Sequence, residues 1–151
     1  MNKYILVVIF VLSCFFTKTS CVIPEQLNYT LSADEIEIIA LVRNSVADTK
    51  WMRASTPDEL DIILGCYYTA PLVSRINNST WEFVNKPTDW HYKIKAKNIK
   101  INRLFENKAV VYFDLTEYDP LTCNRFFYKA EYHLIKTENG WRINHILITD
   151  F

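Results

Sequence analysis

The sequence predicts an α+β protein in which N-terminal helices pack on one strongly bent antiparallel β-sheet. Two capping boxes precede helically spaced apolar residues in the first half of the chain, and segments of alternating apolar and polar residues fill the second half. An Asn139-Gly140 pair, which is a strong hairpin signal, leads into the last alternating segment. Helices followed by consecutive strands favour a single sheet that wraps its helices.

The expected helices are marked chiefly by their N-termini. Ser32-Ala33-Asp34-Glu35 is the first capping box, and a helix is expected from it over about residues 33–50. Thr56-Pro57-Asp58-Glu59 is the second, with proline at the first helical position, where its missing N–H costs nothing. A third, short helix is expected after Pro71 and should break at Asn77-Asn78-Ser79.

The second half is expected to form a meander of long strands, over residues 91–104, 108–118, 125–136 and 141–148. Within the first of these, the apolar residues change from even to odd positions, which indicates a β-bulge near Asn98. Because bulges bend sheets, we expect the meander to curve around the helices.

Strand alternation assigns side chains to the two faces of this sheet. The concave face, toward the helices, is expected to carry Phe113, Leu115, Glu117, Tyr128, Tyr132, Trp141, Ile143 and His145. The convex face is expected to carry the apolar or aromatic residues Val110, Tyr112, Phe127 and Ile146. An apolar outer face suggests a protein partner or a homodimer.

Residues 1–21 are predicted to be a signal peptide or a lipoprotein signal. An apolar run of about a dozen residues follows Lys3, too short at about 1.5 Å per residue to cross a ~30 Å hydrocarbon core, and has the size of a secretory h-region. Two cysteines preceded by small residues, Cys14 and Cys21, are alternative lipidation sites. We therefore expect export, to the periplasm or cell envelope as a lipoprotein or as a secreted protein, with residues 22–31 as a tether and residues 32–151 as the domain.

The remaining cysteines, Cys66 and Cys123, form an even pair once the chain is processed near Cys21. A disulfide between them is one expectation for an oxidising compartment. Two unpaired buried cysteines, behaving as small hydrophobic side chains, are the alternative. Lipidation at Cys14 would instead leave an odd number of thiols.

Composition excludes several classes of function. The chain has 17 basic and 17 acidic residues, and removal of residues 1–21 leaves it slightly acidic, which argues against nucleic acid as a partner. His91, His133 and His145 lack metal-ligand spacing, and no glycine-rich phosphate loop occurs, so no metal or cofactor is expected. The one basic cluster, Lys93, Lys95 and Lys97 with Lys100, is either a solvated strand face or a site for an acidic partner or lipid headgroups.

The order of these motifs resembles the nuclear transport factor 2-like (cystatin-like α+β) superfamily over about residues 32–150. The resemblance is carried by the capped helix from Ser32, by Tyr67-Tyr68-Thr69, by the meander and by Asn139-Gly140-Trp141-Arg142-Ile143. Within the superfamily, Trp90-His91-Tyr92 and the strand Ala109 to Glu117 are similar to segments of the IMS and lumazine-binding-like groups. The resemblance implies a cone-shaped fold with a pocket between helices and concave sheet, and no single function.

The pocket that this resemblance implies suggests its own site residues. Superfamily isomerases use an acid–base pair in an apolar cavity, and Glu117 and His145 are the candidates here. Tyr68, Tyr132 and Trp141 are expected to contact a ligand. The alternative is that Glu117 lies in solvent at a strand end and that His145 is a satisfied core histidine.

The leading hypothesis is a non-catalytic exported domain that binds a protein partner or a small ligand. An accessory lipoprotein, or an envelope immunity or assembly protein, fits it, with membrane contact only through a lipid anchor. The alternative is a small-molecule isomerase or hydro-lyase that uses an acid or base in the cone cavity.

Overall fold

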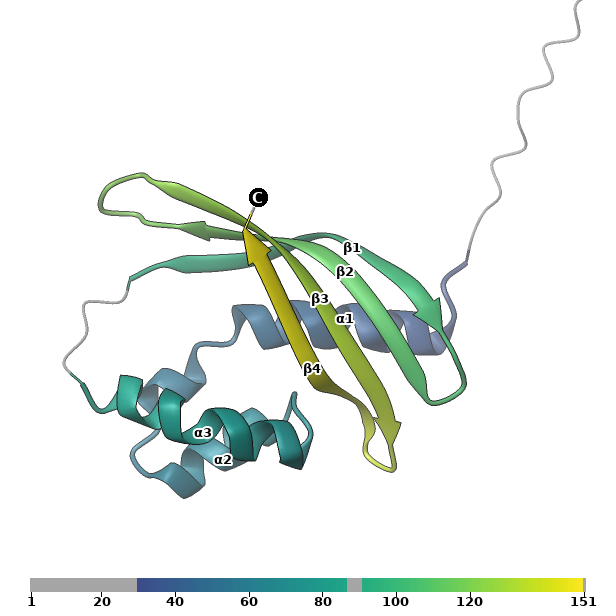
Figure 1. Cartoon of the computed structure of the whole chain (residues 1–151), viewed down its shortest axis with the longest axis horizontal. Helices are drawn as coiled ribbons and strands as arrows, with labels where there is room; N and C mark the ends of the chain where they lie inside the picture. Colours follow the sequence, from purple (N-terminus) through teal and green to yellow (C-terminus); the bar gives the residue numbers. More distant parts are fainter. Residues whose placement is uncertain (1–29, 87–90, 151) are drawn as a thin grey trace, which may run out of the picture. The chain divides into compact units, whose positions relative to one another are not determined.

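The computed structural model describes residues 30–86 and 91–150. The predicted signal segment, most of the predicted tether, and both candidate lipidation sites, Cys14 and Cys21, lie outside the described residues. From Leu31 onward the chain forms one unit, whose helices gather on one side of a curved sheet (Figure 1).

Capping side chains fix the start of the first two helices, as predicted. Ahead of α1 (Ala33–Ala47), the Ser32 hydroxyl accepts a hydrogen bond from the Glu35 N–H at 3.3 Å, and the Glu35 carboxylate accepts from the Ser32 N–H at 2.8 Å. Ahead of α2 (Pro57–Gly65), the Thr56 hydroxyl accepts from the Glu59 N–H at 3.1 Å. α1 ends earlier than expected, and a short 3-10 helix, η1 (Lys50–Arg53), follows it.

The third helix, α3 (Ala70–Val84), continues through the segment where a break was predicted. The Asn77 amide donates to Asp61 and, at 3.3 Å, to the Pro57 carbonyl, both on α2. The Ser79 and Thr80 hydroxyls donate to the Ile76 carbonyl at 2.9 Å and 2.8 Å. These polar side chains are satisfied without competing for the backbone N–H groups of α3, so the predicted break was wrong.

Four antiparallel strands form the sheet in the order β1-β2-β3-β4, which confirms the predicted meander and the α+β class. They are β1 (Lys93–Leu104), β2 (Lys108–Tyr118), β3 (Arg125–Thr137) and β4 (Gly140–Asp150). Asn98 has φ 51° where the β1–β2 register shifts, which confirms the predicted bulge. Its amide donates to the Asp114 carboxylate at 2.6 Å and so holds the bulge against β2.

The main core lies between α1, α3 and the inner face of the sheet. Its fully buried members include Ile38, Val42, Val111, Leu134, Trp141 and Ile143. A smaller cluster, Ala54, Leu60, Leu64 and Val73, joins α2 to α3. Within the described part of the chain, no helix is both long enough and apolar enough to cross a membrane.

The β1–β2 register shifts again between Ile101 and Arg103, and a further bulge, in β4, reverses the predicted orientation of the C-terminal half of β4. Leu134 pairs with Ile143 and His133 pairs with His145, so Asn144 is the extra residue. His145 therefore lies on the outer face, with its ring 5.6 Å from that of His133, and its predicted place on the concave face was wrong. Ile146 was assigned to the outer face and instead packs against the core.

This bulge occurs where β4 meets the connection between α2 and α3. The Thr69 N–H donates to the Ile143 carbonyl at 3.0 Å, and the Ile143 N–H donates to the Tyr67 carbonyl at 2.9 Å. The Thr69 hydroxyl donates to the Asn144 side chain at 3.1 Å. The connection thus pairs with the edge of β4 up to Ile143, and the extra residue follows directly after that pairing.

Hydrogen bonds from Trp141 connect the β3–β4 hairpin to α1. The Trp141 side chain is fully buried, its backbone N–H donates to Glu37 at 2.9 Å, and its indole N–H donates to Asp34 at 3.1 Å. The Lys136 ammonium donates to the same Asp34 carboxylate at 2.7 Å. Gly140 has φ 91°, and a Cβ there would overlap the Glu37 carboxylate, so glycine is required where the hairpin meets the helix.

The predicted Cys66–Cys123 disulfide is not formed in this structure, because both thiols are free. Cys66 follows α2, and its thiol donates to the Ile62 carbonyl at 3.4 Å. Cys123 lies in the β2–β3 turn with φ 60°, and the Tyr118 hydroxyl donates to its sulfur at 3.7 Å. Both thiols are exposed, so the alternative of two buried cysteines is wrong as well.

We expect the ion pair between Lys136 and Asp34 to make the free energy of unfolding depend on pH. The bond from Lys136, followed by that from Trp141, lowers the pKa of Asp34 below its usual 3.8. The folded state then binds a proton less readily than the unfolded state, so this stabilisation is present above pH 3.8 and is lost as the pH falls below it. Thermal unfolding of the wild type and of Asp34→Asn, followed by circular dichroism across the acidic range, measures the effect.

The wild type should be the more stable protein near neutral pH, and this advantage should shrink on acidification. The amide introduced by Asp34→Asn keeps the size of the side chain but cannot pair as an anion with Lys136. A stability difference that stays constant with pH would show that the charge of Asp34 does not contribute.

Candidate functional site

A cavity of about 290 Å³ lies between the helices and the inner face of the sheet. It is lined by Ser45, Val46, Trp51, Ile63, Leu64, Tyr67, Tyr68, Ile76, Thr80, Ile94, Leu115, Glu117, Tyr132 and Ile148. These residues come from α1, η1, α2, the α2–α3 connection, α3 and each of the strands β1 to β4, and most are apolar. A cavity of this volume and composition is of the kind that takes a small, largely apolar molecule.

Two tyrosines bring hydroxyl groups to this cavity. Tyr68 lies between α2 and α3, and Tyr132 is on β3 with 5% of its surface exposed. Within the described residues neither hydroxyl has a hydrogen-bond partner. Because no described side-chain N or O atom is both sealed from solvent and unpartnered, the two hydroxyls open onto the cavity.

Burial keeps both phenols in the neutral, proton-donating form. It raises the pKa of Tyr68 to about 12. It also raises the pKa of Tyr132, with a further contribution from the neighbouring Tyr68. The cavity therefore presents two neutral hydroxyl groups that can donate hydrogen bonds to an acceptor at any physiological pH.

A carboxylate also reaches the cavity. Glu117, near the end of β2, is half-buried, and the Tyr128 hydroxyl donates to its Oε2 at 3.4 Å. Its register partners are Ile94 on β1 and Phe126 on β3, so the group sits in apolar surroundings. Glu117 is therefore neither a fully solvated strand-end residue nor part of an acid–base pair with His145.

Tyr67 adds a polar contact at the boundary of the cavity. Its hydroxyl donates to the Asp48 carboxylate at 2.6 Å, which links the end of α2 to the end of α1. Burial first, and then this bond to Asp48, raises the pKa of Tyr67 to about 12. Unlike Tyr68 and Tyr132, Tyr67 uses its hydroxyl within the protein.

The structure thus brings together three of the residues predicted for the site: Tyr68, Tyr132 and Glu117. Trp141 is not among them, because it is fully buried in the core and its indole N–H is bonded to Asp34, so its predicted contact with a ligand was wrong. His145 lies on the other face of the sheet. Two residues that line the cavity, Trp51 and Ile148, were not predicted. A signal for Ile148 was present, because the apolar residues of the last strand change from odd to even positions at Ile146 and Ile148, as they change parity at the bulge in the first strand.

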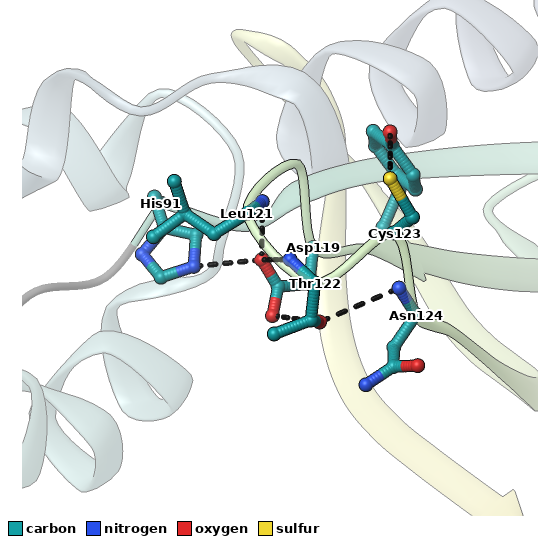
Figure 2. A network of polar contacts seen from close by, with 7 residues as sticks. His91, Asp119, Leu121, Thr122, Cys123 and Asn124 are labelled. Carbon is teal, nitrogen blue, oxygen red and sulfur yellow. Dashed lines mark hydrogen bonds and ion pairs between the residues drawn. The ribbon is translucent and has the colours of Figure 1, made fainter.

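A second polar network, shown in Figure 2, closes the β2–β3 turn. Asp119 is 5% exposed and accepts from His91 at 2.8 Å, from the Leu121 N–H at 2.8 Å and from the Thr122 hydroxyl. The bond from Thr122 is the largest cause that lowers the pKa of Asp119 to about 2. Because the carboxylate is fully engaged, we assign this network to holding the turn and the segment before β1 together.

No set of three or more histidine, cysteine or acidic side chains in the described ranges is arranged to hold a metal ion. The outer face does bring His133 and His145 together, with Glu131 accepting from His133 at 2.6 Å. That arrangement joins β3 and β4 beside the β4 bulge and does not reach the cavity.

Comparisons with known proteins address the fold. No protein-family model matches the chain, and no curated protein matches it. A solved structure from Novosphingobium aromaticivorans, provisionally assigned as an aromatic ring hydroxylase, is similar with a TM-score of 0.55 at 11% identity, over 78% of this chain and 89% of that one. The intermembrane space region of the chloroplast protein ARC6 matches with a TM-score of 0.49 at 12% identity, over 81% of this chain and 99% of that one.

The first of these similarities supports the fold that the sequence resembles. Three α-helices packed on a four-stranded antiparallel sheet are consistent with the nuclear transport factor 2-like fold. Proteins of this fold include both ligand-binding domains and enzymes, so the fold alone does not decide between them.

We expect the two cavity hydroxyls to contribute nothing to stability. Tyr68→Phe and Tyr132→Phe each remove a hydroxyl that faces the cavity and lacks a protein partner, so the free energy of unfolding should stay the same or rise by up to about 1 kcal/mol. Tyr67→Phe is the matched control, because it removes the bond to Asp48 and should lower the free energy of unfolding by about 1 kcal/mol. Urea denaturation of the three variants would measure this, and a loss at Tyr68 or Tyr132 equal to that at Tyr67 would contradict it.

Proposed function

We propose that this chain is a binding domain whose cavity takes a small, largely apolar molecule that carries a hydrogen-bond acceptor oxygen. The observation that carries this proposal is the pair of unpartnered hydroxyls, on Tyr68 and Tyr132, in an otherwise apolar cavity. Because these hydroxyls open onto the cavity, a ligand that fills it must supply an acceptor oxygen or leave them buried without a partner, which costs free energy.

The charge and size of the cavity narrow the ligand further. Glu117 would repel an anion, so the ligand is neutral or cationic. The volume of about 290 Å³ favours a compact molecule, such as a fused aromatic or a branched aliphatic ketone, over an extended chain. The rings of Trp51, Tyr68 and Tyr132 offer apolar surface against which a flat ligand can pack.

The second candidate function is proton transfer by Glu117, as in an isomerase or hydro-lyase. It is favoured by one observation: a carboxylate in apolar surroundings reaches the same cavity as two hydroxyl donors. Glu117 would take a proton from a carbon next to a carbonyl whose oxygen is held by Tyr68 and Tyr132. It would act alone, because His145 lies on the outer face.

A matched pair of probes tests the binding proposal: 2-acetylnaphthalene, which has a carbonyl acceptor, and 2-ethylnaphthalene, which does not. We expect the ketone to bind about fivefold more tightly, which is what a net hydrogen bond of about 1 kcal/mol provides. Trp51 lines the cavity, so the change in intrinsic tryptophan fluorescence during titration would measure both affinities. In Tyr68→Phe/Tyr132→Phe the preference for the ketone should disappear, while affinity for the hydrocarbon remains.

The same ketone separates the two candidate functions. In deuterated water, a non-catalytic domain leaves the methyl protons of bound 2-acetylnaphthalene unexchanged, and Glu117→Gln still binds it. Exchange that the wild type accelerates and Glu117→Gln does not would favour the catalytic candidate. Equal affinity for ketone and hydrocarbon, or no binding of either, would overturn the binding proposal.

We also propose that the domain is exported, either as an accessory lipoprotein or as an immunity or assembly protein of the cell envelope. Support comes from the apolar run behind Lys3, and from the small residues that precede Cys14 and Cys21. In this setting the ligand or partner is met on the far side of a membrane.

Intact-mass measurement of the chain from cells tests export. We expect a mass that lacks about the first 20 residues, because processing at or near Cys21 fits the small residues Thr19 and Ser20. An added lipid mass on Cys21 would show an anchored form, its absence a released form, and a lipid on Cys14 the other predicted site. A mass equal to the full unprocessed chain would contradict cleavage of a signal segment.

A further inference from the structure

The outer face of the sheet carries a groove of about 430 Å³, on the opposite side from the cavity. Four cationic side chains line it, those of Lys93, Lys95, Lys97 and Arg125. The rest of its wall is formed by Thr116, Tyr118 and Phe127. No acidic side chain lines the groove, although acidic and basic residues are equal in number over the whole chain.

The three lysines have no ionic partner within the described residues. Asp114 lies opposite Lys97 in the β1–β2 register, but its carboxylate is bonded to Lys129 and to the Asn98 amide. The guanidinium of Arg125 lies 5.6 Å from the centre of the Tyr118 ring, a cation–π contact that leaves its positive charge uncompensated. The groove thus gathers like charges whose mutual repulsion an anionic ligand would relieve.

The spacing of the lysines identifies the shape of that ligand. Lys93, Lys95 and Lys97 are alternate residues of β1 ahead of the bulge, and therefore point to the same face about 6.6–6.8 Å apart. Acidic side chains at alternate positions of an extended peptide have the same repeat. The exposed ring of Phe127, with 53% of its surface accessible, and that of Tyr118 can contact the apolar side chains or backbone between them.

We propose that this groove binds an extended acidic segment of a partner protein, whose alternate carboxylates face Lys93, Lys95 and Lys97. The segment would run along β1, with Arg125 at the far wall of the groove. This interaction lies beyond the ligand-binding function proposed above and does not depend on it, because the cavity and the groove lie on opposite faces of the sheet.

Two other occupants fit the groove less well. A membrane surface meets side chains that protrude, whereas these cations line a hollow that a peptide can enter. In a two-fold dimer whose axis passes through the groove, a second copy would present the same face, so lysines would meet lysines. Complementary charge therefore favours an acidic protein segment.

A labelled peptide of four Glu-Thr repeats tests the proposal, with binding to the full chain followed by fluorescence anisotropy at low ionic strength. The wild type should bind it, and K93E/K95E should bind it about tenfold more weakly, because two attractive charges become repulsive. The matched control is K50E/K86E, which makes the same change in net charge on η1 and after α3, and should bind like the wild type. All four lysines are exposed, so both variants should remain folded.

Two further arms of the experiment separate the alternatives. A Gln-Thr peptide should not bind, and a peptide with its four glutamates in one block should bind more weakly than the alternating one. Equal binding by K93E/K95E and K50E/K86E, or equal binding of the Glu-Thr and Gln-Thr peptides, would overturn the proposal. So would lysine-dependent sedimentation of the chain with phosphatidylglycerol vesicles in the absence of peptide binding, which would assign the groove to a membrane surface.

Discussion

The contact between α1 and the β3–β4 hairpin at Trp141 is the constraint on which the rest of the domain depends. It joins residues more than 100 positions apart, since Asp34 and Glu37 of the first helix receive the indole and backbone N–H groups of Trp141. The same helix places Ile38 and Val42 against the inner face of the sheet, and its last turn supplies Ser45 and Val46 to the cavity. The cavity wall is thus formed by a helix that is held in place by contacts between the two ends of the domain.

Features with a local sequence signal could be predicted. The caps at Ser32 and Thr56 depend on residues within a few positions of each other, and the bulge at Asn98 is marked by the change of apolar parity along its own strand; all are present. The extent of α3 could not be predicted, because the side chain of Asn77 is satisfied by residues of α2. The bulge at Asn144 had a sequence signal in the shift from Ile143 to Ile146, but it lies next to a distant pairing, that of Ile143 with Tyr67 and Thr69, which no local pattern reveals.

The residues of the candidate site could be predicted where strand alternation continues without a bulge. Tyr132 and Glu117 lie in the unbroken register between β2 and β3 and were placed correctly, whereas His145 lies one residue beyond a bulge and was placed on the wrong face. Trp141 shows a second limit of the prediction. Strand alternation assigns a side chain to one face of the sheet, but it does not say whether the side chain lines a cavity or is packed in the core. That distinction depends on α1, which fills the space above Trp141 and leaves the space above Tyr132 open.

Because β1 is an edge strand of the sheet, its lysines have a second effect. The strand order leaves one side of β1 without a strand partner in the described fold (Figure 1). An open strand edge can template the growth of a sheet from molecule to molecule, and a row of lysines beside it opposes that growth. The same three lysines would then both bind the partner and keep the protein from aggregating. Loss of their positive charge would therefore weaken partner binding and also promote aggregation.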